Sequence, residues 1–172
     1  VYYSAHVIVM EKLDLKGRKH GSKKQRLHHW RAQYVQQMVQ DKAHRNGQRV
    51  SRVCAWNTSR LAFDGSGAVT RGEKNHSLCT FQNGKRYHCD LSASYNIGAR
   101  YFVREIFKSL SVTMGQRIAA KVPGCVKRST CTLSSLIRLH AELGSTEHQL
   151  SEFSLHRTEA VPPITNEGSL RL

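Results

Sequence analysis

Two acidic residues, far apart in the sequence, stand where carboxylates could bind divalent metal ions. Glu11 follows the short apolar run 6–10, and Asp90 opens a later stretch with apolar residues at helical spacing. Carboxylate oxygens suit Mg²⁺, and paired ions of this kind activate water and stabilise the leaving oxygen in phosphodiester cleavage. Plainer interpretations exist: Glu11 as an ordinary acid at the end of a strand, and Asp90 as the N-cap of a helix. Spacing alone does not choose between them.

The charge of the chain favours a nucleic-acid partner. Lys and Arg number 27 against 12 Asp and Glu, which gives a net charge of +15. Such an excess is typical of proteins that bind polyanions, although a merely basic surface is the alternative. The candidate nucleic-acid-binding residues gather in a basic stretch before and into the first long helix and in a later hairpin. They are Lys16, Arg18, Lys19, Lys23, Lys24, Arg26, Lys85 and Arg86.

The first part of the chain predicts a strand, a helix and a strand. Residues 6–10 are apolar and β-branched, residues 24–46 have helical periodicity with Asn46-Gly47 as a stop, and residues 49–55 alternate. This order indicates an α/β layered fold. The expected apolar face of the helix consists of Leu27, Trp30, Tyr34, Val35, Met38 and Val39.

A hairpin is predicted at Asn83-Gly84, the strongest short-range hairpin signal in the chain. A two-residue turn there pairs Gln82 with Lys85 and Cys79 with His88. Cys79 and Cys89 then lie on opposite faces of the hairpin, so we expect no disulfide between them.

Helices are predicted after the hairpin, over residues 90–110, 112–122 and 133–143. Beyond Gly144 the composition turns polar, and residues 145–172 are predicted to be a disordered tail. The expected apolar face of the first of these helices consists of Ala93, Ile97, Tyr101, Phe102 and Ile106.

Compartment and boundaries can also be predicted. The odd count of cysteines, five, favours reduced thiols, and Cys125 and Cys131 are expected to be ordinary thiols. No apolar run approaches the roughly 20 residues that a membrane span needs. The first residue, Val1, is not Met and lies inside an apparent strand, so we expect the chain to be cut from a longer protein.

Several motifs together resemble the TnpB/OrfB proteins encoded by bacterial insertion sequences, which are relatives of the type V CRISPR nucleases. The stretch from Asp90 to Ile97 is similar to the family's third catalytic motif, Asp-x-Asn-Ala-x-x-Asn-Ile, with Ser92 in place of the first Asn. The apolar strand that ends in Glu11 resembles the second motif. Thr58-Ser59 stands where the family has Thr-Ser before its zinc finger. The resemblance covers about residues 5–108.

This resemblance implies an RNase-H-like (RuvC-type) domain in a transposon-associated nuclease that cuts DNA under the direction of a guide RNA. Glu11 and Asp90 would be its Mg²⁺ ligands, in a bacterial cytoplasmic, nucleoid-associated protein. The family's further catalytic Asp would lie before Val1, so we expect no cleavage by this chain alone.

The resemblance also implies a division of the chain. Residues 1–56 would carry the RuvC-like core with the second motif and the long helix, residues 57–89 a zinc-finger insert that binds target nucleic acid, and residues 90–110 the third-motif helix. Residues 111–144 would be a helical extension, followed by the tail 145–172.

The sequence departs from the family at the zinc finger. The family holds Zn²⁺ with two Cys-x-x-Cys pairs. Here Ala62 and Gly65 stand at the positions of the first two cysteines, and Gln82 stands three residues after Cys79, at the position of the fourth. Structural zinc needs four convergent ligands. We therefore expect a degenerate finger, without zinc, held by its turn and by packing.

Two alternatives to a nuclease remain open. A decayed relative could keep the charge and bind DNA or RNA without catalysis, or the chain could be a basic structural protein without a specific site. Tyr87, Phe81 and Trp56 could stack on bases, but packing is the commoner role of such aromatic residues.

Overall fold

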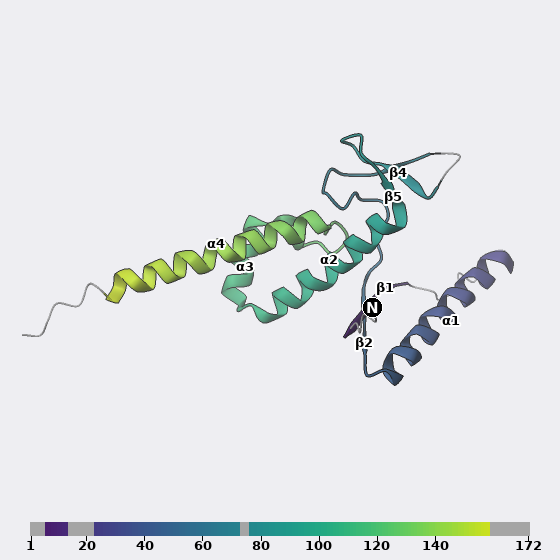
Figure 1. The fold of residues 1–172 in the computed structure, drawn as a ribbon, viewed down its shortest axis with the longest axis horizontal. Helices are drawn as coiled ribbons and strands as arrows, with labels where there is room; N and C mark the ends of the chain where they lie inside the picture. Colours follow the sequence, from purple (N-terminus) through teal and green to yellow (C-terminus); the bar gives the residue numbers. More distant parts are fainter. Residues whose placement is uncertain (1–5, 14–22, 73–75, 159–172) are drawn as a thin grey trace, which may run out of the picture.

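The computed structural model describes the backbone of residues 6–13, 23–72 and 76–158, and in the helical stretches 23–30 and 146–158 it describes the backbone alone. Within these ranges the protein is a mixed α/β structure (Figure 1). This agrees with the predicted α/β class at its coarsest level.

The N-terminal part is a parallel strand–helix–strand unit. Strand β1 (Val7–Lys12) pairs in parallel with β2 (Arg49–Cys54), from Val7 opposite Arg49 to Lys12 opposite Cys54, and helix α1 (Lys23–Arg45) makes the crossover. Figure 1 shows the two strands between α1 on one side and the later helix α2 on the other. The predicted order of elements is confirmed here.

The packed face of α1 differs from the predicted one where side chains are described, and those of Leu27 and Trp30 lie outside the described residues. Ala43 is buried, and the Gln36 amide donates to the carbonyl of Glu11 at 3.1 Å, whereas Tyr34, Val35 and Met38 are about half exposed or more. Apolar residues recur at helical spacing on α1, but the two-stranded sheet covers a neighbouring face of the helix.

A small insert (residues 57–88) follows β2 and contains an antiparallel sheet. Its strands β3 (Thr70–Arg71), β4 (Leu78–Thr80) and β5 (Arg86–His88) lie in that order. Buried Ala62, Cys79, Phe81 and Cys89 form its core, with Phe63, Val69 and Tyr87 packed against them.

The register of the hairpin β4–β5 corrects the prediction by one residue. Cys79 pairs with Tyr87, not with His88, because the loop has three residues: Phe81 pairs with Lys85, and Gly84 has φ of 82°. This is the three-residue loop that ends in a left-handed glycine, in place of the two-residue turn. A one-residue slip reverses the facing of side chains, so Cys79 and Cys89 lie on the same side and share one core.

The C-terminal part consists of helices. Helix α2 (Cys89–Ser109) is followed by α3 (Val112–Lys121), the short 3₁₀ helix η1 (Pro123–Cys125) and α4 (Leu133–Thr158). The largest buried cluster lies among these helices, and α2 also packs against β1 and β2. The cluster consists of Val103, Ile118, Val122, Cys125, Cys131 and Leu139.

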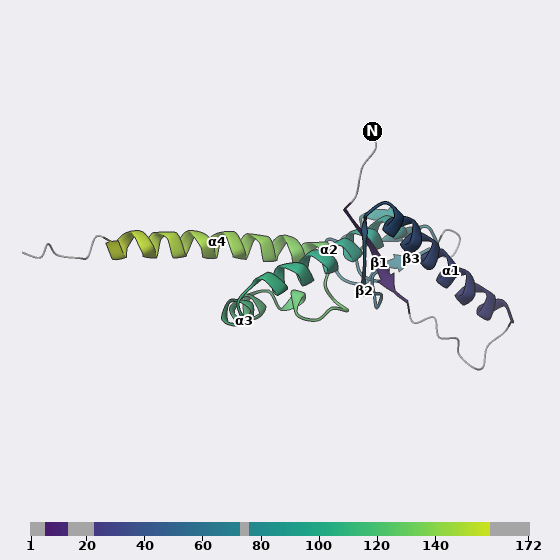
Figure 2. The same ribbon diagram turned by 90° about the horizontal axis from the view of Figure 1, so that it is seen from below.

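Two predictions for these helices were wrong. Residues 145–158 belong to α4, which continues to Thr158 and projects from the rest of the molecule in Figures 1 and 2, so the predicted disorder is wrong there. Residues 159–172 lie outside the described residues. Phe102, expected on the apolar face of α2, is 55% exposed. None of the described helices is both long enough and apolar enough to cross a membrane.

Candidate functional site

Glu11 lies near the C-terminal end of β1 and is half buried. Its carboxylate accepts a hydrogen bond from the hydroxyl of Thr58 through Oε1. The same hydroxyl lies 3.0 Å from the carbonyl of Ala55, in the turn that leaves β2. Thr58 is itself 3% exposed, so the contact to the carboxylate is shielded from bulk water. One oxygen of Glu11 is thus held by the protein.

Asn96 connects this carboxylate site to α2 and α4. It is fully buried, and its amide nitrogen donates to the carbonyls of Thr58 and Leu61, both at 2.9 Å. Its amide oxygen accepts from the backbone N–H of Leu133 at 3.3 Å. All three hydrogen bonds join segments more than 30 residues apart in sequence. Asn96 therefore fixes the backbone that carries the Thr58 hydroxyl.

Arg100 lies one turn further along α2 and is 5% exposed. Its guanidinium donates to the carbonyls of Cys54 at 2.6 Å and Trp56 at 2.8 Å, at the end of β2. It also donates to the carbonyls of Ser129 and Cys131, at 3.1 and 3.2 Å. Burial lowers the pKa of Arg100, while the charge of Glu11 contributes in the opposite direction. The residue joins β2, α2 and the loop before α4.

Asp90 lies in the first turn of α2 and is exposed. The N-cap of α2 is His88, so the interpretation of Asp90 as N-cap was wrong. A negative charge in this first turn is still favourable to the helix. No residue in the described ranges donates a hydrogen bond to its carboxylate. Its oxygens are therefore accessible to a ligand from solvent.

Glu11 and Asp90 share no hydrogen-bond partner among the described residues. Asp90 precedes Asn96 by six residues, or about 9 Å along the helix axis at 1.5 Å per residue. Among the residues that the structure describes, no three His, Cys, Asp or Glu side chains gather around one point as metal ligands. Thr58 and Asn96 join the two acidic segments in one hydrogen-bonded region.

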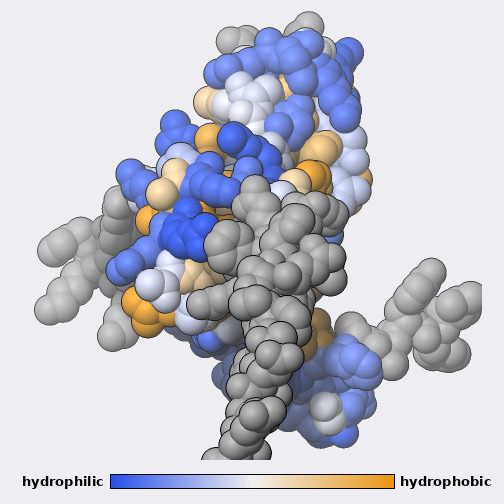
Figure 3. Space-filling view, turned by 90° about the vertical axis from the view of Figure 1, so that its left-hand side faces the viewer, coloured by the Kyte–Doolittle hydropathy of each residue, from blue (hydrophilic) through white to orange (hydrophobic). Residues whose placement is uncertain are grey.

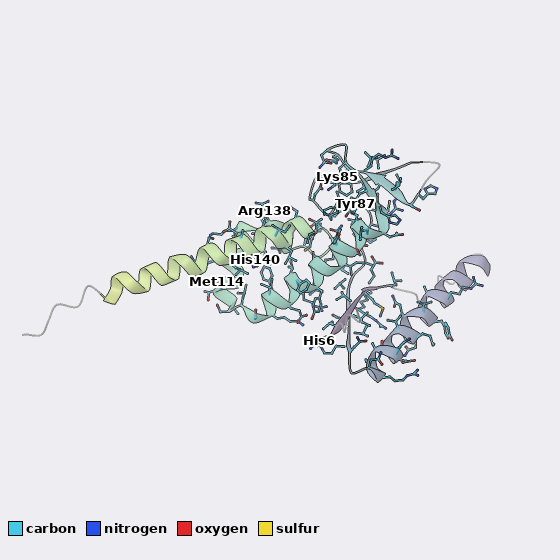
Figure 4. The ribbon with its side chains drawn as sticks, in the orientation of Figure 1. His6, Lys85, Tyr87, Met114, Arg138 and His140 are labelled. Atoms are coloured by element: carbon cyan, nitrogen blue, oxygen red, sulfur yellow. The ribbon has the colours of Figure 1, made fainter. Side chains whose placement is uncertain are left out.

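The basic candidates lie at two separate places. Lys85 and Arg86 are exposed on the hairpin, and the Lys85 ammonium lies 5.2 and 5.3 Å from the ring centroids of Phe63 and Tyr87. Figure 4 shows Lys85 and Tyr87 together on the insert. Lys23, Lys24 and Arg26 belong to the first turns of α1. The predicted residues Lys16, Arg18 and Lys19 lie outside the described residues.

The insert is closed by packing and hydrogen bonds at the place where the resembled family has its finger. Ala62 is fully buried beside Cys79 and Cys89. The Asp64 carboxylate accepts from the amide of Asn83 and from the backbone N–H of Ser66, both at 2.9 Å, and so links the two loops. A Cβ at Gly65 would lie 2.9 Å from the hydroxyl of Ser134, so this position faces α4.

Four of the cysteines form two buried thiol pairs. Burial and a hydrogen bond with Cys89 raise the pKa of Cys79 to about 11. A hydrogen bond with Cys131 and burial raise the pKa of Cys125, whereas the hydrogen bond from Cys125 and the charge of Arg100 lower the pKa of Cys131. Each pair contains at least one thiol that stays protonated at neutral pH.

The three aromatic candidates differ in their surroundings. Phe81 is buried, and Tyr87 packs edge-on against Phe63, so both belong to the core of the insert as the packing alternative predicts. Trp56 is 68% exposed, and the packing interpretation is wrong for it. Its indole is available for contact with a partner.

Sequence reasoning missed the roles of Thr58, Asn96 and Arg100. Asn96 and Arg100 lie at helical spacing with buried Val103, on the same face of α2 as buried Ala93. A polar residue that falls within an apolar periodicity, as these two do, is the signal that could have identified them. For Thr58 the only signal in the sequence is its place before the insert.

No match was found among the models of protein families, the curated proteins or the solved structures. The structure itself shows a mixed α/β protein in which an acidic strand end is joined by hydrogen bonds to a helix with a buried polar face.

Proposed function

We propose that this chain is the C-terminal part of a transposon-associated, RNA-guided DNA endonuclease with an RNase-H-like (RuvC-type) core. Glu11 and Asp90 bind Mg²⁺ in the intact protein, and the basic surfaces bind nucleic acid. The observation that carries this proposal is the hydrogen-bonded line from Glu11 through Thr58 to Asn96. It joins the three segments that resemble the family's second motif, its Thr-Ser and its third motif.

The carboxylates have free oxygens suited to this role. Thr58 occupies one oxygen of Glu11, and the carboxylate of Asp90 is exposed. Bound Mg²⁺ would activate a water for attack on a phosphodiester. The described residues supply no third acidic ligand at one point. In the proposed intact protein a further Asp completes the set, and this chain alone does not cut DNA.

The charge supports the nucleic-acid part of the proposal. The net charge is +15. Among the described residues, the only cations that form ion pairs with acidic side chains are Arg104, Lys108 and Lys121. Lys85 and Arg86 are exposed cations on the hairpin. Hydrophilic residues cover most of the surface at the top of Figure 3, where the insert lies. A phosphate backbone would find uncompensated positive charge there.

A cleavage assay tests the nuclease. The chain is expressed with the segment encoded upstream of Val1 and incubated with its guide RNA, target DNA and Mg²⁺. We expect guided cleavage that Asp90→Ala abolishes. Asp41→Ala, which changes an acid on α1, is the matched control and should leave cleavage intact. Cleavage that survives Asp90→Ala and Glu11→Gln would overturn the assignment of the two carboxylates.

The second candidate is a basic DNA- or RNA-binding protein without catalysis. It is favoured by Ala62, Gly65 and Gln82, which stand where the resembled family has zinc ligands. It predicts nucleic-acid binding by both the chain and its extended form, with no cleavage by either at any Mg²⁺ concentration. The same assay therefore decides between the two candidates.

A further inference from the structure

A cavity of about 210 Å³ lies between the insert and the start of α4. The insert contributes Leu61, Ala62, Gly65 and Gly67, and the helical part contributes the remaining wall. That wall carries four hydroxyl side chains and one guanidinium, and no acidic residue lines the cavity. The polar residues are Thr130, Thr132, Ser134, Ser135 and Arg138. Hydroxyl and guanidinium groups can donate hydrogen bonds to an anion, and no acidic residue here would repel it. Such a lining therefore favours the binding of an anion.

We propose that this cavity binds a phosphate group, with Arg138 as its cation and Ser134 as a hydroxyl donor. Arg138 is exposed in the first turns of α4, where Figure 4 labels it. None of the described carboxylates forms an ion pair with it. A guanidinium presents a fork of donors that matches phosphate oxygens. Its charge is therefore available to a ligand.

The donors in the cavity differ in how far they are already used. The Thr130 hydroxyl donates to the carbonyl of Lys127 at 3.1 Å, and the hydroxyls of Thr132 and Ser135 lie 3.4 Å apart. Within the described ranges, the Ser134 hydroxyl has no hydrogen-bond partner. Ser134 and Arg138 lie four residues apart and so project from the same face of α4. Together they can contact one phosphate.

The backbone amides at the start of α4 are not the basis of this site. The N–H of Leu133 donates to Asn96, and the N–H of Ser134 donates to the carbonyl of Phe63 at 2.9 Å. These amides are occupied by the protein. The proposal rests instead on the side chains, which makes it sensitive to single substitutions.

Glycine keeps the cavity open at its two walls. A Cβ at Gly65 would lie 2.9 Å from the Ser134 hydroxyl, and one at Gly124 would lie 3.0 Å from the Ser135 hydroxyl. Any larger residue at either position would displace these hydroxyls. The exposed cations Lys127 and Arg128 lie in the loop that leads to Thr130, and their charge adds to the positive potential of the cavity.

The phosphate can come from a nucleic-acid backbone or from free phosphate, and two measurements on the full chain separate these sources. The first is amide NMR during titration with inorganic phosphate, with chloride at equal ionic strength as the reference. We expect saturable shifts at Gly65 and Ser134, absent in Arg138→Gln and weakened in Ser134→Ala. Arg117→Gln, which removes an exposed cation of α3, should leave the shifts unchanged. Equal shifts in all variants would overturn the site.

The second measurement is the affinity for a labelled DNA duplex at increasing salt, and this arm alone rests on the proposed function. If the cavity holds a backbone phosphate, Arg138→Gln lowers the slope of log K against log[salt] by about 0.9, and Arg117→Gln does not. An unchanged slope together with saturable phosphate shifts assigns the site to free phosphate. A chain that binds no DNA contradicts the proposed function, while the phosphate titration still decides the cavity.

Discussion

Arg100 is a cation on the buried face of α2 whose described hydrogen bonds all end on backbone carbonyls. Four carbonyls, from the end of β2 and the loop before α4, depend on this one side chain. One turn earlier, Asn96 donates to two backbone carbonyls and accepts from the N–H of Leu133. At the scale of the residue, buried polar groups join the segments around Glu11.

Replacing Arg100 by Met should strongly destabilise the protein. The apolar side chain fills similar space, but several buried carbonyls lose their donors, which costs about 1–3 kcal/mol each when no water replaces them. We expect the free energy of unfolding in urea, followed by circular dichroism, to fall by about 3 kcal/mol or more. Arg117→Met, at an exposed position of α3, is the control, with a change within about 0.5 kcal/mol. Equal effects would show that the buried hydrogen bonds are unimportant.

Replacing Thr58 by Val should release the Glu11 carboxylate. Valine keeps the shape of Thr58 but loses the hydroxyl, and the free energy of unfolding should fall by about 1 kcal/mol. Thr58→Ser keeps the donor and should recover most of that loss. Urea unfolding of the three proteins checks this. A serine variant as unstable as the valine variant would contradict the role of the hydroxyl.

At the scale of the element, the sequence predicted which helices and strands form better than it predicted which of their faces are buried. The periods of apolar residues placed β1, α1, β2, α2 and α3 close to their observed bounds. The predicted hairpin register was wrong because the Asn-Gly signal marks a hairpin but does not fix the length of its loop. One extra loop residue moves the side chains of one strand to the opposite face relative to their partners. The predicted buried face of α1 was wrong at Tyr34, Val35 and Met38. Periodicity shows on which side of a helix the apolar residues lie, but not which side the neighbouring elements cover.

Asp64 stabilises the insert in a way that depends on pH. Burial raises the pKa of Asp64, but hydrogen bonds from Ser66 and Asn83 lower it by more. The net result is a pKa below its ordinary 3.8. A carboxylate with a lowered pKa in the folded state stabilises the fold above its ordinary pKa, and this contribution disappears as the pH falls through the lowered value.

Asp64→Asn should therefore reduce the free energy of unfolding by about 1 kcal/mol at pH 7. Wild type and variant should converge as the pH falls below 3.8. Urea unfolding at a series of pH values measures this difference. Asp41→Asn on α1 is the matched control. A difference between wild type and Asp64→Asn that is independent of pH would show that shape, and not charge, is responsible.

At the scale of the whole molecule, positive charge is the property that the sequence predicted most directly. Composition alone gives it, whereas the long course of α4 and the cavity beside it depend on contacts between distant segments. Residues 145–158 were predicted to be disordered because they are polar, yet they continue a helix that starts in the core. Polar composition does not reveal that a helix is already nucleated by packing.

The positive surface of the hairpin should contribute to DNA binding through electrostatics. Replacing both Lys85 and Arg86 by Gln should reduce the slope of log K against log[salt] by about 1.8, because each duplex phosphate that a cation neutralises contributes about 0.9 to that slope. Fluorescence anisotropy with a labelled duplex measures the slope. Lys121→Gln with Lys108→Gln, two cations already in ion pairs, is the control. The same slope in both double variants would place the DNA elsewhere.

The central claim is that Glu11 and Asp90 act on the same metal ion site, and paramagnetic broadening by Mn²⁺, which like Mg²⁺ prefers oxygen ligands, tests it on the chain itself. Amide NMR spectra are recorded with substoichiometric Mn²⁺. We predict that signals at Lys12 and Leu91 broaden together in the wild type, and that Glu11→Gln removes the broadening at both. Broadening at Leu91 that persists in Glu11→Gln would contradict the shared site and leave only a basic nucleic-acid binder.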